Sequence, residues 1–149
     1  MGTSPADLAS QLVRAFGRPD DIAAILTDDA AWWISPSVPE ELLPSLTKGR
    51  QHIHANMKRV FDGDFYDGPT MSVVIHHAIA QGNMGVVRFT LSGNYRRGGT
   101  YNNEYTVWIE ARDTMIAQVW EYVDVAHAFT QMATAGLPVP TYATGDQAP

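Results

Sequence analysis

The stretch Met115-Ile-Ala-Gln-Val-Trp-Glu-Tyr-Val-Asp-Val125 decides the fold, because it shows a strand pattern with one charge in an apolar series. Every second residue counted from Met115 is apolar except Glu121. Alternate side chains of a strand face opposite sides of a sheet, so Glu121 is expected to point into the core. A buried carboxylate costs free energy unless it has a partner or a shifted pKa. Such carboxylates gather at functional sites, which makes Glu121 the leading candidate residue.

The rest of the chain predicts helices first and a sheet afterwards. Helical spacing of apolar residues indicates helices near the N-terminus, around Ile53–Phe61 and over 126–135, with a strand at 30–34. Three consecutive strand-like runs lead into the opening stretch, at 70–80, 85–95 and 100–111. A segment with three prolines, 35–44, is expected to be a loop. This order predicts an α+β fold, a curved antiparallel sheet closed by N-terminal helices.

The turns between the strands predict which side chains share the inner face of the sheet. If Tyr95 pairs with Thr100 across the turn of residues 96–99, Arg88 comes to lie diagonally from Glu121. Glu121 itself is then opposite Tyr105. The expected inner face is Arg88, Thr90, Asn103, Tyr105, Val107, Val119, Glu121 and Val123. An apolar floor that carries a few polar groups is typical of a small-molecule pocket.

Three residues from outside these hairpins are added to the predicted pocket. Trp32 and Trp33 point to opposite faces of one strand, and Trp32 shares its face with Ile34. Met57 belongs to the apolar face of the third predicted helix. We therefore expect Trp32, Ile34 and Met57 to contact a bound molecule together with Thr90, Asn103, Val107 and Val119.

Composition excludes several classes of function. The chain has 149 residues, 45% of them hydrophobic, which predicts a single domain with its core at about 6–135 and a mobile tail at 136–149. A net charge of −6 argues against a nucleic-acid partner, and no apolar run is long enough for a membrane span. With no cysteine and five dispersed histidines, no metal site or other cofactor is expected. The cytoplasm is the predicted location.

Several motifs resemble the nuclear-transport-factor-2-like (cystatin-like) superfamily, in its SnoaL-like polyketide-cyclase branch. They are the Thr27-Asp-Asp-Ala-Ala-Trp32 opening, the Lys48-Gly-Arg50 helix start, and the runs 101–107 and 115–124. The resemblance implies a cone-shaped α+β barrel in which helices close a curved sheet over a deep pocket. It also implies a homodimer that forms through the outer face of the sheet.

Three catalytic patterns of this superfamily bear on the site. Against limonene-epoxide hydrolase, Arg88 matches an arginine and Glu121 replaces an acid, but Thr90 stands at an aspartate position. Trp32 and Ile34 stand at that enzyme's tyrosine and asparagine positions. Ketosteroid isomerase would place its catalytic acids near Ile34 or Ser35 and near Thr106. Phenazine-biosynthesis A/B-like proteins resemble this chain at Glu121, where the resemblance implies an acid/base residue.

Three hypotheses of function therefore stand side by side. The first is a cofactor-independent isomerase, cyclase or dehydratase for a hydrophobic cyclic or polyketide-like substrate. In it Glu121 exchanges a proton, Arg88 tunes its charge, and Tyr105 or Asn103 binds a carbonyl oxygen. The second is a non-catalytic module that binds a small ligand or a partner. The third is an epoxide-hydrolase-like enzyme with an altered catalytic set.

Overall fold

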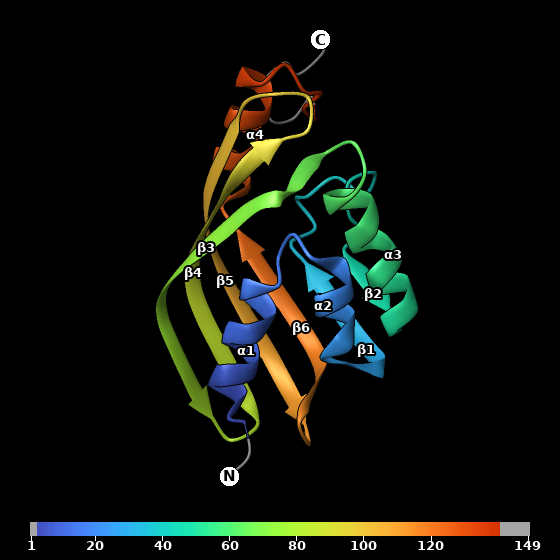
Figure 1. Ribbon diagram of the computed structural model, residues 1–149, viewed down its shortest axis with the longest axis vertical. Coiled ribbons are helices and arrows are strands. Elements are labelled where there is room, and N and C mark those ends of the chain that lie inside the picture. The colour runs from blue at the N-terminus through green and yellow to red at the C-terminus, as the bar shows by residue number, and fades with distance from the viewer. Residues whose placement is uncertain (1–2, 141–149) are drawn as a thin grey trace.

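The computed structural model describes residues 3–140 and contains, within them, four helices and a curved sheet of six strands (Figure 1). This arrangement confirms the predicted α+β class. The elements in chain order are α1 (Pro5–Arg14), α2 (Pro19–Ala24), β1 (Leu26–Ile34), β2 (Leu46–Lys48), α3 (Arg50–Phe61), β3 (Tyr66–Gln81), β4 (Met84–Tyr95), β5 (Thr100–Arg112), β6 (Met115–Val123) and α4 (Val125–Thr134).

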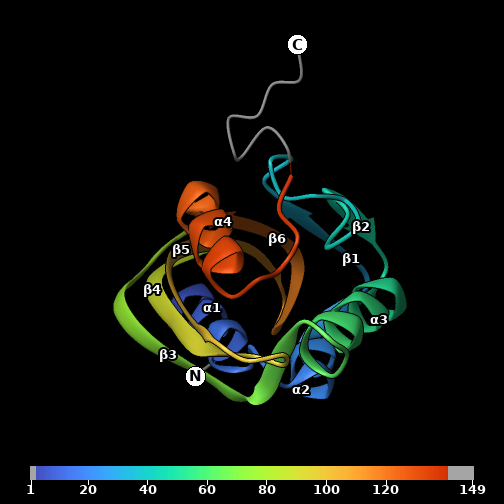
Figure 2. The same ribbon diagram turned by 90° about the horizontal axis from the view of Figure 1, so that it is seen from above.

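The strand order in the sheet is β2-β1-β6-β5-β4-β3, and the sheet stays open between its two edge strands. β1 pairs with β6 in parallel, while every other neighbouring pair is antiparallel. The sheet is therefore antiparallel as predicted, with this one parallel pair as an unpredicted exception. The parallel pairing places β1 directly beside the strand that carries Glu121. Viewed from above, the sheet curls around α1, and α4 lies over the upper opening (Figure 2).

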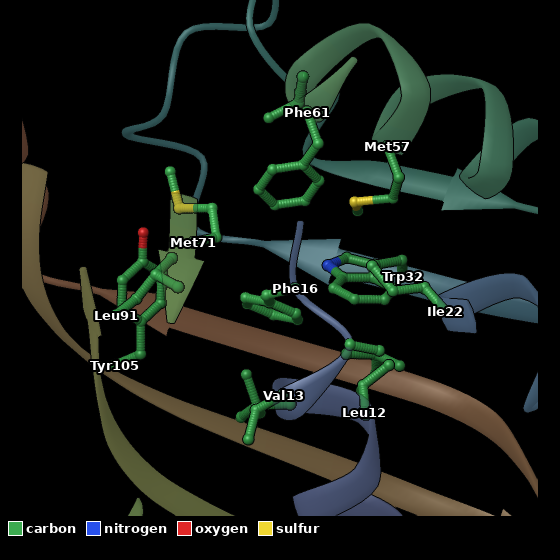
Figure 3. Close-up of a cluster of buried hydrophobic side chains, with 14 of the residues drawn as sticks. Leu12, Val13, Phe16, Ile22, Trp32, Met57, Phe61, Met71, Leu91 and Tyr105 are labelled. Carbon is green, nitrogen blue, oxygen red and sulfur yellow. The ribbon is translucent and has the colours of Figure 1, made fainter. Parts of the chain in front are cut away.

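Helix α1 packs into the concave side of the sheet because its sequence gives it one apolar face and a well-capped N-terminus. Ser4 and Asp7 form a reciprocal capping box at its N-terminus, and Leu8, Leu12 and Val13 are buried. The helix gives way to Gly17, whose φ of 97° favours glycine. A Cβ at Gly17 would also lie 2.4 Å from a backbone oxygen, so only glycine allows this turn. Phe16, just before it, is thereby fixed in the centre of the core (Figure 3).

The predicted register between β4 and β5 was wrong by one residue. The structure pairs Asn94 with Thr100, because Gly98 and Gly99 both adopt positive φ and Tyr95 bonds to Gly99 within the turn. A one-residue slip reverses every side chain of a strand. Arg88 and Thr90 consequently belong to the outer face of the sheet, whereas Val87, Phe89, Leu91 and Tyr95 face the core.

Two smaller predictions also need correction. β2 was not predicted, although the proline-rich segment before it is a loop as expected. The strand predicted at 70–80 begins earlier, because Asp67-Gly-Pro69, residues typical of a turn, lie inside β3 where its pairing with β4 becomes irregular. Of the predicted tail, residues 136–140 are described and 141–149 lie outside the described residues. Within residues 3–140 no helix has both the length and the apolar character to cross a membrane.

Candidate functional site

Glu121 is a buried acid in the middle of β6. Its neighbours across the sheet are Ile34 on β1 and Val107 on β5, and only 6% of its surface is exposed. The indole Nε1 of Trp32 donates a hydrogen bond of 2.9 Å to Glu121 Oε1. No other hydrogen bond or ion pair of this carboxyl occurs within residues 3–140, so Oε2 is left without a protein partner.

Burial changes the protonation of this group. Removal from water raises the pKa of Glu121 from 4.5 to about 7, against the opposing effect of the Trp32 hydrogen bond. A neutral indole can satisfy one carboxylate oxygen but cannot neutralise the charge. Glu121 therefore changes its charge near neutral pH, which is where a general acid or base works best.

The carboxyl borders a small cavity of about 60 Å³, room for roughly four to six water molecules. Apart from Glu121 and three tyrosines, its lining is apolar. Helices, strands and the proline-rich loop all contribute. The lining residues are Phe16, Trp32, Ile34, Val38, Pro39, Leu42, Leu43, Met57, Val60, Phe61, Tyr66, Leu91, Tyr101, Tyr105, Glu121, Val123, Val125, Ala128, Phe129 and Met132.

A thin apolar wall separates the cavity from the surface. Four residues, Val38, Pro39, Leu42 and Met132, line both the cavity and a wider open groove outside it. They come from the proline-rich loop and from α4. Any molecule larger than the cavity would have to displace this wall, which contains neither β-sheet nor a buried ion pair among the residues that the structure describes.

Three phenols form the second polar feature of the cavity. The hydroxyls of Tyr101 and Tyr105 lie 2.5 Å apart, and Tyr66 hydrogen-bonds to Tyr101. Burial raises the pKa of all three phenols, so they stay protonated at neutral pH. The site is thus a hydrogen-bond donor array in the same cavity as a titratable carboxyl.

A count of hydrogens shows that this array has a donor to spare. Asn103, 1% exposed, donates from Nδ2 to Tyr101 Oη at 3.2 Å and to the Asp124 carbonyl at 2.9 Å. Both of its amide hydrogens are used, so it orients the cluster from behind. The three phenols share two mutual hydrogen bonds, which use only two of their three hydroxyl hydrogens. The third is available to an oxygen atom in the cavity.

The structure gathers some predicted site residues at the cavity and separates others. Trp32, Ile34, Met57, Tyr105 and Glu121 line it. Val107 and Val119 are fully buried beneath the lining, and Asn103 stands behind Tyr101.

The predicted positions of Arg88 and Thr90 beside Glu121 were wrong, because the β4 register turns both side chains outward. Arg88 is exposed, and it takes part in none of the ion pairs found within residues 3–140. Thr90 lies between His76 and Glu104 on the outer face, with hydrogen bonds of 2.7 Å to each.

Sequence reasoning missed several lining residues. Tyr101 had a usable signal, since it shares strand parity with Asn103 and Tyr105. Tyr66 had none, because β3 begins four residues before the strand predicted at 70–80. Phe16 follows the end of α1, far from Glu121 in the sequence. Phe129 and Met132 lie within α4, and the sequence does not show that this helix folds over the cavity. Within residues 3–140 no three histidine, aspartate or glutamate side chains are grouped to hold a metal ion.

A curved sheet that wraps a helix is the fold of nuclear-transport-factor-2-like proteins. Within that class, the sequence profile of the SnoaL-like domain matches residues 11–119, and the chain belongs to this family. No curated protein matches the sequence at a significant level.

Solved structures agree on the fold at low sequence identity. A ketosteroid isomerase-like protein from Catenulispora acidiphila, in complex with trimethylamine, is 16% identical with a TM-score of 0.70, covering 93% of this chain and 100% of that one. TerC, co-crystallised with polyporic acid, is 17% identical with a TM-score of 0.72, and the coverages are 87% and 99%. A limonene-epoxide-hydrolase-like epoxide hydrolase from M. tuberculosis is 17% identical with a TM-score of 0.68, covering 90% and 92%. These likenesses establish the fold alone.

Proposed function

We propose that this protein is a cofactor-independent acid/base enzyme in which Glu121 moves a proton to or from a small organic substrate. The observation that carries the proposal is a buried carboxyl, titrating at about 7, beside a cavity with a spare phenol donor. A carbonyl oxygen that accepts this hydrogen would gain stabilisation as negative charge develops on it. Glu121 would meanwhile hold the proton removed from the neighbouring carbon.

The substrate class follows from the lining. Hydrophobic walls and two polar groups suit a cyclic ketone or a polyketide-like carbonyl compound, for isomerisation, cyclisation or dehydration. The ligands of the Catenulispora protein and of TerC support the idea that small organic molecules enter such cavities. A polycyclic substrate would additionally require the wall of Val38, Pro39, Leu42 and Met132 to move, since the cavity measures about 60 Å³.

Arg88 has no part in this proposal, because it lies on the opposite face from Glu121. The same geometry removes support from an epoxide-hydrolase-like mechanism, which would need that arginine beside the acid. Non-catalytic ligand binding is the second candidate function. It is favoured by the presence of a single carboxyl in the described lining, where a two-acid mechanism would need another.

Exchange of α-protons in D₂O tests the enzymatic proposal without knowledge of the natural substrate. We expect the protein to accelerate deuterium incorporation into cyclopentanone or cyclohexanone, followed by proton NMR. Glu121→Gln should abolish the acceleration and Tyr105→Phe should reduce it, while Glu104→Gln on the outer face serves as the matched acid control. Equal exchange by the wild type and Glu121→Gln would eliminate Glu121 as the base.

We also propose that two copies pair through the outer face of the sheet. This face carries exposed apolar side chains from three strands, Val74, Ile79, Trp108 and Tyr122, and Trp33 packs against Tyr122 with ring centres 5.0 Å apart. Exposed aromatic groups of this kind are typical of protein interfaces. Small-molecule chemistry would then take place on the concave side of each copy, away from the contact.

A further inference from the structure

The charge of Glu121 lacks a counter-ion in the protein. Among the described residues that line the cavity, none is lysine, arginine or histidine. Each ion pair found within residues 3–140 lies elsewhere, between side chains that are partly or largely exposed. The Trp32 hydrogen bond offsets only part of the cost of desolvating an ionised Glu121, and a cation entering the cavity would remove much of the remainder.

The walls of the cavity suit such a cation. Seven of its lining residues are aromatic, and Phe16 lies among the rings of Trp32, Phe61 and Tyr105 (Figure 3). Phe16 lies 6.1 Å from Trp32 and 6.3 Å from Phe61 between ring centres. The faces of aromatic rings carry partial negative charge and attract organic cations, most strongly where water is excluded.

Negative charge around the groove outside the apolar wall also favours a cation. Glu40 and Glu41 border the open groove that the apolar wall separates from the cavity, and no lysine or arginine is among the described residues of that groove. The whole chain has a net charge of −6. A negative field around an entrance raises the local concentration of cations and lowers that of anions.

The size of the cavity restricts the cation to a few non-hydrogen atoms. A space of about 60 Å³ holds roughly four to six water molecules, comparable to an ammonium nitrogen with three or four short alkyl groups. Metal ions fit poorly, because the site offers a single carboxyl and otherwise rings and aliphatic groups.

We propose that the cavity binds a small alkylammonium cation, with Glu121 as its counter-ion and the surrounding rings as a cage. A protonated tertiary amine could also donate its N–H to Glu121 Oε2, the oxygen that Trp32 leaves free. The proposal uses the cavity of the proposed enzyme but not proton transfer by Glu121. A bound ammonium ion would keep Glu121 ionised and would exclude a ketone, so the two ligands compete.

Binding of the cation should depend on pH through Glu121. The other titratable groups facing it are the phenols of Tyr66 on β3 and of Tyr101 and Tyr105 on β5, whose raised pKa values keep them neutral. β1 and α3 present only apolar or indole groups to the cavity, Phe16 after α1 presents its ring, and α4 presents Phe129 and Met132. Glu40 and Glu41 lie outside the wall, on the loop. Asp124 and His127, at the start of α4, are not in the lining.

Tetramethylammonium chloride is the probe, since its permanent charge leaves Glu121 as the only titrating partner. Binding is measured by calorimetry on the intact chain and by quenching of tryptophan fluorescence. Because Glu121 titrates at about 7, affinity should rise about tenfold from pH 6 to pH 8. At pH 6, binding should release protons, detected by comparing buffers of different ionisation enthalpy.

The controls separate charge from shape. Neutral tert-butanol has the same number of non-hydrogen atoms and should bind at least about tenfold more weakly. Glu121→Gln should lose the affinity and its pH dependence, whereas Glu104→Gln should retain both. The melting temperature of each variant checks that it is folded.

Two results would overturn the inference: no saturable binding of tetramethylammonium at pH 8, or binding that Glu121→Gln leaves unchanged. Neither result depends on α-proton exchange. If exchange fails while the cation binds as described, only the enzymatic proposal falls. If exchange succeeds while the cation does not bind, only the present inference falls.

Discussion

At the scale of single residues, Glu121 shows how one anomaly of pattern can identify a site. Its sequence position predicted a buried carboxylate, and the structure confirms the burial. The partner was not predictable. Trp32 is 89 residues away and reaches Glu121 only because β1 pairs in parallel with β6, an arrangement that no hairpin turn encodes.

Glu121 should also make stability depend on pH. Between pH 4.5 and about 7 the native state retains a proton that the unfolded chain has lost, so the free energy of unfolding falls as pH rises. The total loss is about 3 kcal/mol. Glu121→Gln can still accept the Trp32 hydrogen bond and has no proton to lose, so it should remove this decline.

Urea unfolding of both proteins at pH 5 and pH 8 measures the effect. The advantage of the variant should grow by about 2.5 kcal/mol between the two pH values, since part of the total loss lies below pH 5. Glu104→Gln, on the exposed outer face, is the matched control and should follow the wild type. If the difference in free energy of unfolding between wild type and Glu121→Gln is the same at pH 5 and pH 8, the pKa of Glu121 is not raised by folding.

At the scale of elements, the alternation of apolar and polar residues within a strand predicted the inner face of the sheet better than the length of a turn did. The odd positions of β4 between Val87 and Leu91 are apolar and the even ones are polar, which already indicates the face that is observed. Counting the register of β4 and β5 across the glycine turn predicted the opposite face for the residues of β4. The count was off by one because two successive glycines with positive φ admit an extra residue into the turn. The pairing of β5 with β6 is shifted by two residues from the prediction, so that Glu121 pairs with Val107 instead of Tyr105. A shift of two leaves each side chain on the predicted face of the sheet.

A pair of substitutions on β4 tests this register. Arg88→Ala should change the free energy of unfolding by less than about 0.5 kcal/mol, because the side chain is exposed. Leu91→Ala should cost about 2–5 kcal/mol, because the side chain is 2% exposed and lines the cavity. Thermal or urea unfolding gives both values. The predicted register would instead require a large loss at Arg88 and little at Leu91.

At the scale of the whole molecule, the class of fold can be predicted from the sequence more completely than the shape and lining of the cavity can. Strand and helix patterns are local, and they were sufficient for the α+β class. The cavity depends on how α1, α4 and the proline-rich loop approach the sheet, which sets whether Phe16, Met132 and Val38 meet around Glu121. Such contacts between distant segments leave no periodic signal in the chain.

The proposed homodimer belongs to the same scale. Trp108→Glu places a charge in the middle of the exposed outer face, where Trp108 is 43% exposed. We expect this variant to be a folded monomer and the wild type to be a dimer, as measured by sedimentation velocity. Arg88→Ala, which does not alter the apolar patch, is the control. A wild-type chain that sediments as a monomer at all concentrations would rule out this pairing.

Glu121 is a cavity carboxyl without a cationic partner among the described residues, and titration of that carboxyl is the most direct test. Carbon-13 NMR of protein labelled at glutamate, with Glu121→Gln to assign the signal, follows its ionisation. We expect a midpoint of about 7 in the free protein and a lower midpoint with tetramethylammonium bound. A midpoint near 4.5, unchanged by the cation, would contradict it.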